Sequence, residues 1–482
     1  MASVAQVEQG FLKGALTRSG VVFRGVPYAK AVRFGPATVP EPWAGTRDAS
    51  ADGVVAPQLR SRLAPVMGEM DAPQAEDCQF LTIWTTGCDR PLKPVLLFFH
   101  GGAYVTGAGS QPCYDGEALA ARGEMVVVCA NFRLGALGYL PGACPETVEP
   151  ALTDQHMAVE WVFKNIQAFG GDPSQITLMG QSAGAMSIAH AMLHEPVAEK
   201  VSRLILQSGA FSRPVLTRST AKRVKRDFLL NLGIDPDDDC GTVLNSVSTR
   251  QILEAQVKTL QAWNGALVFR PAVADAMNNE AFLTAFAKAC EGKEVLIGVT
   301  AEEGKAFFRT DDGCDVELLA RKLDTEVSEG TYEAYAAVFP ELSPAEVAAL
   351  AMTDHSYARG TFQLSALLAA QATTCYAYVF DWAPANAPLG ACHCIELPFV
   401  FDSVETMRDV GMLRGADPSE MRTITSDVQQ EWIHFVHAGR PADTAWAPFD
   451  PQACNARRFG LHGHEVDPGL VRRWLSQSSG VV

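Results

Sequence analysis

The chain has 482 residues, 48% of them hydrophobic and 20% charged, so it can bury a large core and is not disordered throughout. Its formal net charge of -16 argues against nucleic acid or an anionic membrane as a partner. No apolar run reaches about 18 residues, so we predict no membrane span, and the length allows either two or three ordinary domains or one large α/β domain with insertions.

The N-terminal residues and the cysteines indicate the cellular compartment. Residues 1–8 lack a basic region followed by an apolar stretch, so we see no signal peptide and predict a cytoplasmic protein. Most of the 12 cysteines lie in apolar segments, as Cys129 and Cys375 do, which favours buried structural thiols over a disulfide framework. The segment 392–394 (Cys-His-Cys) is too tight for three ligands of one zinc ion. We therefore predict no metal and no cofactor.

Short runs typical of β-strands alternate with helical stretches along most of the chain. Several of these runs are apolar at every position, as expected for strands that are covered on both faces. The predicted strands, in chain order, are 80–84, 95–100, 126–132, 176–180, 204–208, 295–300 and 376–382, and helices are predicted at 153–169 and 182–193. This alternation predicts an α/β fold with a mostly parallel central sheet flanked by helices.

Two regions interrupt the alternation, at 212–290 and at 315–372. Both contain charged helical segments, and the second holds Ser343 and Glu346 in a capping-box pattern with proline at the first helical position. Neither supplies obvious central strands. We therefore predict one elaborated domain over 1–482, in which the two helical insertions form a lid or wall over the carboxyl edge of the sheet.

A serine lies between two glycines at the junction of a predicted strand and a predicted helix, in Gly180-Gln181-Ser182-Ala183-Gly184. A sharp strand-to-helix turn would present the Ser182 hydroxyl at the sheet edge, and glycines on either side would relieve crowding in so tight a turn. The pattern alone is weak, because it arises by chance in roughly one chain in six of this length.

A serine hydroxyl needs a base to take its proton, and the base needs an acid to orient it. Glu302 and Glu303 follow the predicted strand 295–300, and we favour Glu303 because Gly304 is adjacent. Of the later histidines, His393 lies in a loop after a late strand, so we predict that it is the base. The order Ser, Glu, His is the one that the α/β-hydrolase plan requires. A solvated loop pair is the alternative for the two glutamates.

The developing oxyanion needs preorganised N–H donors. One candidate is the amide of Ala183, directly after the serine. The others are expected after the predicted strand 95–100, where Gly101-Gly102-Ala103-Tyr104 allows backbone amides to approach a ligand closely. An ordinary glycine turn is the alternative.

With these motifs in place, the sequence resembles the type-B carboxylesterases, the α/β-hydrolase family that includes bacterial para-nitrobenzyl esterases and the cholinesterases. The likeness covers roughly residues 20–450. Its further marks are Phe23-Arg24-Gly25-Val26-Pro27-Tyr28-Ala29, Glu76-Asp77-Cys78-Gln79-Phe80-Leu81, Asn131-Phe132-Arg133-Leu134-Gly135, Phe169-Gly170-Gly171-Asp172-Pro173 and Glu396-Leu397-Pro398-Phe399.

The resemblance implies a role for each predicted site residue. It implies that Ser182 is the nucleophile, Glu303 the acid and His393 the base. It also implies that Ser208 supports the catalytic residues without contacting the substrate itself. The oxyanion donors that it implies are Gly102, Ala103 and Ala183. The glycine loop is of a type that often accepts esters of bulky alcohols.

Three positions depart from the family pattern. Gln181 stands where relatives usually have glutamate, which leaves the imidazolium formed in catalysis with less electrostatic support and makes a cationic ester a poor candidate. Cys78 matches a cysteine that forms a disulfide in secreted relatives, but its partner position is not cysteine, so the resemblance implies a free thiol. The segment 150–155 (Pro-Ala-Leu-Thr-Asp-Gln) replaces the glycine-containing version that is more usual in the family. Together, Gln181 and this Thr-Asp-Gln resemble the bacterial members that cleave aryl carbamates.

These features predict a serine carboxylic-ester hydrolase that acts through an acyl-enzyme on a small-molecule ester. The alternatives are a carbamate or amide hydrolase with the same residues, and a non-catalytic binding protein on the same fold. The sequence indicates neither the natural substrate nor the oligomeric state.

Overall fold

The computed structural model describes residues 3–88, 91–140, 149–237, 240–309, 315–385, 387–461 and 463–476. Its strands are β1 (Val4–Val7), β2 (Gly10–Leu16), β3 (Val21–Pro27), β4 (Lys30–Ala31), β5 (Ala37–Thr38), β6 (Thr46–Ala49), β7 (Phe80–Thr85), β8 (Lys93–Phe99), β9 (Val126–Ala130), β10 (Gly171–Gln181), β11 (Arg203–Gln207), β12 (Leu216–Thr217), β13 (Ala272–Val273), β14 (Glu294–Thr300), β15 (Thr374–Phe380) and β16 (Arg457–Phe459).

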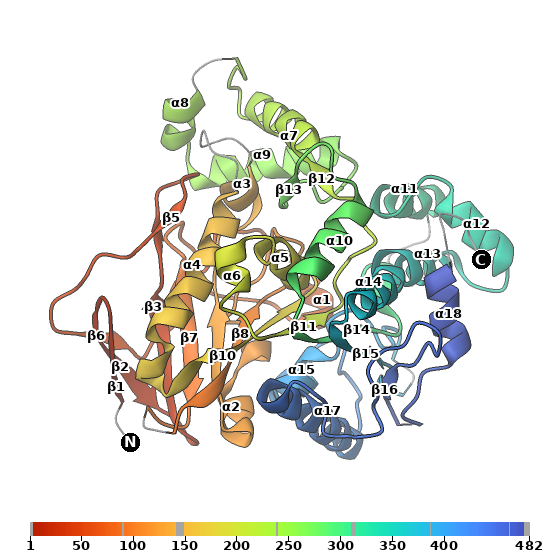
Figure 1. The fold of residues 1–482 in the computed structure, drawn as a ribbon. Helices are drawn as coiled ribbons and strands as arrows, with labels where there is room; N and C mark the ends of the chain where they lie inside the picture. The colour runs from red at the N-terminus through yellow and green to blue at the C-terminus, as the bar shows by residue number, and fades with distance from the viewer. Residues whose placement is uncertain are drawn as a thin grey trace.

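The helices that surround these strands are shown in Figure 1. They are α1 (Ala64–Met67), α2 (Glu117–Gly123), α3 (Gly135–Tyr139), α4 (Pro150–Asn165), α5 (Ala183–Ala191), α6 (Glu195–Ala198), α7 (Arg218–Asn231), α8 (Cys240–Ser246), α9 (Thr249–Ala262), α10 (Asn279–Ala289), α11 (Val316–Glu326), α12 (Thr331–Val338), α13 (Pro344–Met352), α14 (Arg359–Ala370), α15 (Leu397–Val400), α16 (Val404–Met407), α17 (Pro418–Ala438) and α18 (Pro468–Ser476). Four short turns complete the set, η1 (Pro112–Tyr114), η2 (Ile166–Phe169), η3 (Glu303–Ala306) and the π-helical η4 (Thr353–Ala358).

The central sheet has 12 strands in the order β1-β2-β3-β7-β9-β8-β10-β11-β14-β15-β16, with β6 paired to β2. The strands from β9 to β16 pair in parallel, and those from β1 to β9 pair antiparallel along this order. The predicted α/β fold with a mostly parallel sheet is therefore confirmed. Each predicted strand corresponds to one of β7, β8, β9, β10, β11, β14 and β15, with ends that differ by a few residues.

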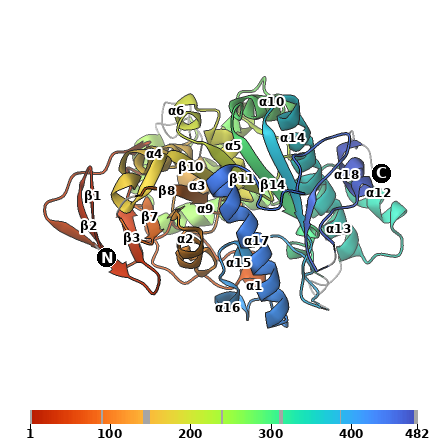
Figure 2. The ribbon, with the colours of Figure 1, turned by 60° about the horizontal axis from the view of Figure 1, so that its bottom comes forward.

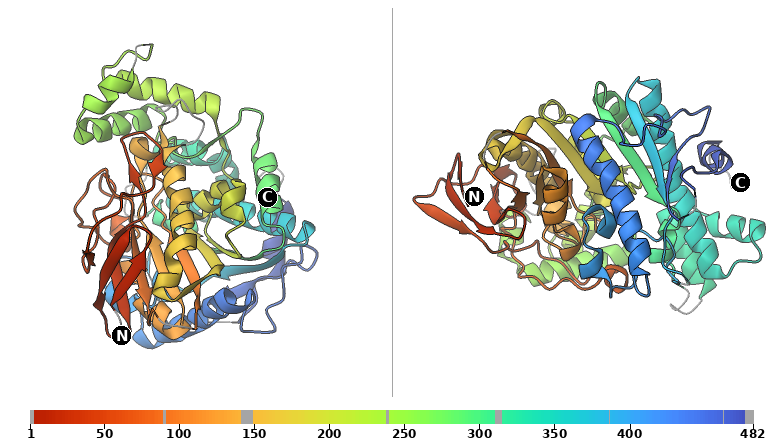
Figure 3. Two further views of the ribbon diagram at one scale, coloured as in Figure 1. Left: turned by 60° about the vertical axis from the view of Figure 1, so that its left-hand side comes forward. Right: turned by 90° about the horizontal axis from the view of Figure 1, so that it is seen from below.

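Apolar side chains on both faces of the strands explain the layers. On β8, Leu97 and Phe99 point into one core with α4, α5, α10 and α14, whereas Phe98 points into the opposite core with Phe401 and with Trp432 of α17. Side chains alternate across a strand, so a run that is apolar throughout requires cover on both sides. Figure 2 shows α17 crossing one face, and the right-hand view of Figure 3 shows the strands behind it.

The two helical regions have different relations to the sheet. The first contains α7, α8 and α9, which gather at one end of the molecule, and the small parallel sheet β12-β13. Its last helix, α10, packs instead on the central sheet, as does α14 of the second region. The predicted capping box of α13 is present, with Ser343 and Glu346 bonding reciprocally and Pro344 at the helix start. The division into one domain with two insertions stays a prediction.

Two predicted helix starts differ from the structure. Helix α4 begins at Pro150, three residues before the predicted start, because proline is well suited to the first turn of a helix. Helix α5 begins at Ala183, and Ser182 has a positive φ of 56° that no residue inside a right-handed helix adopts. The serine therefore belongs to the turn and not to the helix.

Cysteine thiols are part of the core. Cys129 on β9 and Cys375 on β15 are both buried, and burial raises the pKa of Cys375 to about 12. Cys78 is buried and free, as the sequence predicted. Of the helices in the described ranges, none has both the length and the apolar character that a membrane crossing requires.

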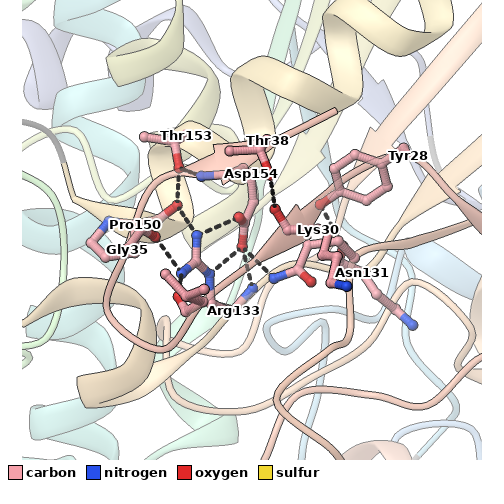
Figure 4. A network of polar contacts seen from close by, with 12 residues as sticks. Tyr28, Lys30, Gly35, Thr38, Asn131, Arg133, Pro150, Thr153 and Asp154 are labelled. Atoms are coloured by element: carbon pink, nitrogen blue, oxygen red, sulfur yellow. Dashed lines mark hydrogen bonds and ion pairs between the residues drawn. The ribbon is translucent and has the colours of Figure 1, made fainter. Parts of the chain in front are cut away.

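A buried ion pair explains the Asn-Phe-Arg-Leu-Gly motif. Figure 4 shows Arg133 surrounded by acceptors, with Nε donating to Asp154 (2.9 Å) and Nη2 donating to Asp154 (2.6 Å) and to the carbonyl of Pro150 (2.9 Å). Nη1 donates to the carbonyls of Gly35 (2.6 Å) and Val32 (3.4 Å). The guanidinium therefore ties the segment after β9 to α4 and to the loop that follows β4.

Removing the charge of Asp154 should strongly destabilise the fold. In Asp154→Asn the guanidinium of Arg133, whose side chain is 3% exposed, loses its charged partner. We expect a loss of about 3–5 kcal/mol in the free energy of unfolding, measured by urea denaturation. The matched control is Glu254→Gln in the exposed pair with Arg250, where we expect no measurable loss because water screens the two charges. Equal losses in the two variants would contradict the prediction.

Candidate active site

The predicted serine lies in a strained turn between β10 and α5. Ser182 has φ 56° and ψ -120°, a conformation that costs energy for a residue with a side chain. Its N–H donates to the carbonyl of Gln207 on β11 at 2.8 Å, and its carbonyl accepts from Met186 at 3.1 Å. The sheet and the first turn of α5 thus hold the serine between them.

The flanking glycines are required by close packing. A Cβ atom on Gly180 would lie 2.6 Å from the carbonyl carbon of Gly184. A Cβ atom on Gly184 would lie 1.9 Å from the carbonyl oxygen of Phe99 on β8. Helix α5 therefore starts in contact with the neighbouring strands, and this contact explains the spacing that the sequence pattern shows.

Glu303 and His393 are joined by a buried hydrogen bond. Glu303 begins η3 directly after β14, and its Oε1 accepts the backbone N–H of Thr300 at 2.8 Å. Its Oε2 accepts from Nδ1 of His393, and both side chains are at most 1% exposed. This bond fixes the proton of neutral imidazole on Nδ1 and leaves Nε2 as an acceptor.

Glu302 bonds to the backbone of Ala391 instead of to the imidazole. Its side chain accepts the N–H of Ala391 at 2.9 Å, and its own N–H donates to the carbonyl of Ala391 at 3.0 Å. It also forms an ion pair with Lys305 and is 38% exposed. Glu302 therefore braces the loop that carries His393, and of the two glutamates Glu303 is the one in contact with the imidazole.

Two aromatic rings that the sequence analysis missed lie beside the imidazole of His393. The ring centroids of Phe307 and Tyr357 are 5.2 Å and 4.9 Å from that of His393. The two rings are parallel within 2°, with centroids 6.4 Å apart. Phe307 follows the turn that begins at Glu303. Its closeness in sequence to the predicted acid could therefore have indicated that it lies near the site. Tyr357 comes from the π-helical η4, and no local pattern marks it.

Gln181 touches the same imidazole from the other side. Its Nε2 lies 3.2 Å from Nε2 of His393 and 3.3 Å from Sγ of Cys394. Because Nε2 of His393 is an acceptor when Nδ1 carries the proton, the amide of Gln181 donates to it. The residue that departs from the family pattern is therefore in direct contact with His393.

The loop after β8 has three consecutive residues with positive φ. They are Gly102 (118°), Ala103 (55°) and Tyr104 (64°). The carbonyl of Gly102 accepts from Thr106 N at 3.0 Å, and a Cβ atom on Gly102 would lie 1.9 Å from the Thr106 carbonyl oxygen. Gly135, just after the Arg133 network, donates to the carbonyl of Tyr104 at 2.7 Å. The buried ion pair is thus linked to the loop.

Five of the predicted residues line one cavity of about 280 Å³: Gly102, Ala103, Ser182, Ala183 and His393. Gln181 lines a neighbouring cavity of about 330 Å³ that shares the wall at Gly102. Ser208 directly follows β11 and is buried, and its Oγ has no hydrogen-bond partner among the described residues. The structure therefore brings together the nucleophile, base and oxyanion candidates, with Glu303 directly behind the base.

A second buried carboxyl lies close to Glu303. Glu396 is 1% exposed, and its Oε1 accepts from Nε2 of Gln207 at 3.2 Å. Burial, and next the charge of Glu303, raise the pKa of Glu396 to about 8. This carboxyl is therefore protonated at neutral pH, so it adds no second negative charge beside the imidazole. It follows His393 by three residues in the Glu-Leu-Pro-Phe motif.

Glu396→Gln should make the stability of the protein less dependent on pH. The folded wild type keeps this proton up to pH about 8, whereas the unfolded chain releases it near 4.5, so wild-type stability falls as pH rises between these values. The slope contributed by one proton is at most about 1.4 kcal/mol per pH unit. We expect urea unfolding at pH 5, 6, 7 and 8 to show that the free energy of unfolding of the variant rises relative to that of the wild type with each step in pH. A constant difference across the series would refute the prediction.

Comparison with known proteins settles the family. Residues 1–470 match the model of the carboxylesterase family. The chain belongs to this family. It is 35% identical over 461 residues to the para-nitrobenzyl esterase of Bacillus subtilis, covering 92% of this chain and 91% of the relative. It is 32% identical over 497 residues to the phenmedipham hydrolase of Pseudarthrobacter oxydans, covering 97% of each.

Solved structures agree with this membership. A PNB esterase structure superimposes with a TM-score of 0.85 at 29% identity, over 99% of this chain and 100% of that chain. A carboxylesterase of Geobacillus stearothermophilus gives a TM-score of 0.83 at 29% identity, over 98% and 100%. The fold is therefore that of the α/β-hydrolases, and the chain is a carboxylic-ester hydrolase, as predicted.

Proposed function

We propose that Ser182, His393 and Glu303 form the catalytic triad of this carboxylesterase and that the reaction passes through an acyl-enzyme. The observation that carries the proposal is the cavity shared by Ser182 and His393, with the buried carboxylate of Glu303 bonded to the far side of the imidazole. Each group has the chemistry that its role requires.

In the first step the Oγ of Ser182 attacks the ester carbonyl while Nε2 of His393 takes its proton. Glu303 holds the Nδ1 proton in place and stabilises the imidazolium. The oxyanion is stabilised by the backbone N–H groups of Gly102, Ala103 and Ala183. The imidazolium then gives its proton to the leaving alcohol, and the acyl group stays on the serine.

In the second step water hydrolyses the acyl-enzyme, with His393 again acting as base. Gln181 donates to Nε2 of the neutral imidazole. Because that nitrogen has one lone pair, Gln181 must turn its amide, or move, before Nε2 can take the proton of Ser182, and it cannot donate to the imidazolium that results. With glutamine here and Glu396 protonated, Glu303 supplies the carboxylate that supports the imidazolium. Ser208 supports the turn from the end of β11.

Covalent labelling tests the proposal. The wild type should hydrolyse p-nitrophenyl butyrate and should be inactivated by a fluorophosphonate that attaches to one serine. Peptide mass spectrometry should find the label on Ser182, and Ser182→Ala should take up none at the same reagent concentration. Label on another serine together with lost activity would overturn the assignment.

Two finer predictions belong to the same site. Esters of bulky alcohols and aryl carbamates are candidate substrates, and phenmedipham is a direct test compound because one similar relative is named a phenmedipham hydrolase. Comparing kcat/KM on ester, carbamate and anilide substrates ranks these reactions. A cytoplasmic location is supported by the free buried thiols, such as Cys78 and Cys129, since oxidising compartments favour disulfides, and cell fractionation tests it.

A further inference from the structure

Arginine side chains are concentrated on the wall of the cavity above Ser182. Four arginines line it: Arg60, which forms an ion pair with Glu69, and Arg62, Arg213 and Arg270. Among its lining residues that the structure describes, none is aspartate or glutamate. The chain as a whole has a net charge of -16, so the sign of the cavity is opposite to that of the protein.

Arg213 and Arg270 are two of these arginines, and they lie near the same side chain of the cavity wall. Arg213 is 8% exposed, and Arg270 donates from Nη2 to the carbonyl of Pro214 at 2.6 Å, which holds its guanidinium in place. Both act on one side chain of the cavity wall: burial raises the pKa of Tyr104, and the charges of Arg270 and Arg213 oppose that rise. The two guanidiniums therefore lie near the same part of the wall.

Two arginines are each separated from His393 by one aromatic ring. The guanidinium carbon of Arg213 lies 5.9 Å from the ring centroid of Tyr357, and that of Arg62 lies 4.7 Å from the ring centroid of Phe307. These are the two parallel rings beside the imidazole. The positive charge is thus close to the reacting centre, at a distance that one substrate molecule can span.

The remaining lining suits the alkyl or aryl part of a substrate. Apolar side chains include Met186, Val215, Leu216 and Leu260. A guanidinium is planar and can donate two parallel N–H bonds to a carboxylate, which gives this pair its geometric specificity. Attraction between opposite charges is also stronger beside the apolar wall of a cavity than in bulk water.

We propose that the cavity selects esters that carry a carboxylate, which Arg213 and Arg270 bind while the ester carbonyl lies at Ser182. The inference rests on the proposed function, because it assigns the substrate class of the same site. The protein's overall negative charge disfavours the approach of anions, so the selection arises from short-range contacts inside the cavity. The carboxylate can belong to the acyl part or to the alcohol part of the ester.

Matched substrate pairs test the proposal and distinguish these two sources. For the acyl part, mono-p-nitrophenyl adipate is compared with p-nitrophenyl hexanoate, which has the same chain length without the charge. For the alcohol part, 4-carboxyphenyl butyrate is compared with 4-carbamoylphenyl butyrate. We expect kcat/KM, corrected for spontaneous hydrolysis, to favour the anion by about tenfold or more in at least one pair.

Two variants test whether Arg213 and Arg270 cause the preference for the anionic ester. Arg213→Gln and Arg270→Gln should each lower the ratio of anionic to neutral kcat/KM by about tenfold, since each removes one partner of the carboxylate. The charge control is Arg122→Gln on α2, where the side chain bonds Gln429 and Ser426 away from the cavity, and this ratio should match the wild type. Melting temperature and fluorophosphonate labelling report whether each variant is folded with a reactive serine.

The outcomes separate this inference from the assignment of the triad. Hydrolysis of the neutral esters with no preference for either anionic ester would overturn the carboxylate proposal and leave the triad intact. A preference that survives in both folded arginine variants would also overturn it. Full activity in Ser182→Ala would instead overturn the proposed function. As a measurement in which the anion itself is not hydrolysed, hexanoate should competitively inhibit hydrolysis of p-nitrophenyl butyrate by the wild type at least tenfold more strongly than hexanamide, and Arg213→Gln should remove most of this difference.

Discussion

Replacing Ser182 by alanine should lower kcat for p-nitrophenyl butyrate by about 10⁴- to 10⁶-fold. The remaining hydrolysis would come from the oxyanion donors and from substrate binding alone. Because the strained turn is fixed by the sheet and by its two glycines, the variant should fold, and its melting temperature should stay close to that of the wild type. Steady-state rates on protein prepared without contact with wild-type enzyme provide the measurement.

Ser208→Ala is the matched control for this loss. Ser208 has a positive φ, of 49°, as Ser182 does, but it is buried and directly follows β11. If its role is to support the turn that carries Ser182, the loss in kcat should be at most about tenfold. A comparable loss in both variants would mean that removal of either hydroxyl disrupts this region, and the assignment of Ser182 would lose its support.

Glu303→Gln should lower kcat by about 10⁴-fold while preserving the shape of the site. The carboxylate of Glu303 accepts from both Thr300 and His393. A glutamine side chain can present its NH₂ group to Nδ1, which stabilises the imidazole tautomer with the proton on Nε2. That tautomer cannot take the proton of the serine, and the support for the imidazolium is lost as well.

Glu302→Gln makes the same chemical change one residue away. Glu302 braces the backbone at Ala391 without touching the imidazole, so we expect a much smaller loss, of about tenfold or less. Labelling by the fluorophosphonate should slow in Glu303→Gln in parallel with kcat, because both reactions need the same base. Similar losses in the two variants would contradict the assignment of Glu303 as the acid.

The places and approximate ends of seven strands of the central sheet could be predicted, because several of them are short apolar runs that require cover on both faces. The serine turn and the glycine loop could be predicted for a related reason. Backbone strain and close approach restrict both to small residues at fixed spacing, as the 1.9 Å approaches at Gly184 and Gly102 illustrate. Such constraints act locally, and local constraints leave a pattern in the sequence.

The surroundings of the imidazole could not be predicted in the same way. Tyr357, Arg213 and Arg270 reach the cavity from segments distant in sequence, and their positions depend on how the two helical regions pack. The pKa of Glu396 depends on burial and on the nearby Glu303, neither of which a sequence pattern encodes. The sequence therefore predicts the reaction, whereas the arginines of the cavity, and with them the proposed preference for esters that carry a carboxylate, emerge only from tertiary packing.

The buried thiols give the protein an internal reporter of its own opening. A thiol reacts with alkylating reagents as the thiolate, and burial raises the pKa of Cys113 and of Cys375 to about 12 and raises that of Cys129 as well. In the folded state these groups are both inaccessible and protonated. The rate at which iodoacetamide modifies them in native buffer therefore reports local opening at η1 for Cys113, at β9 for Cys129 and at β15 for Cys375, with no thiol introduced by mutation.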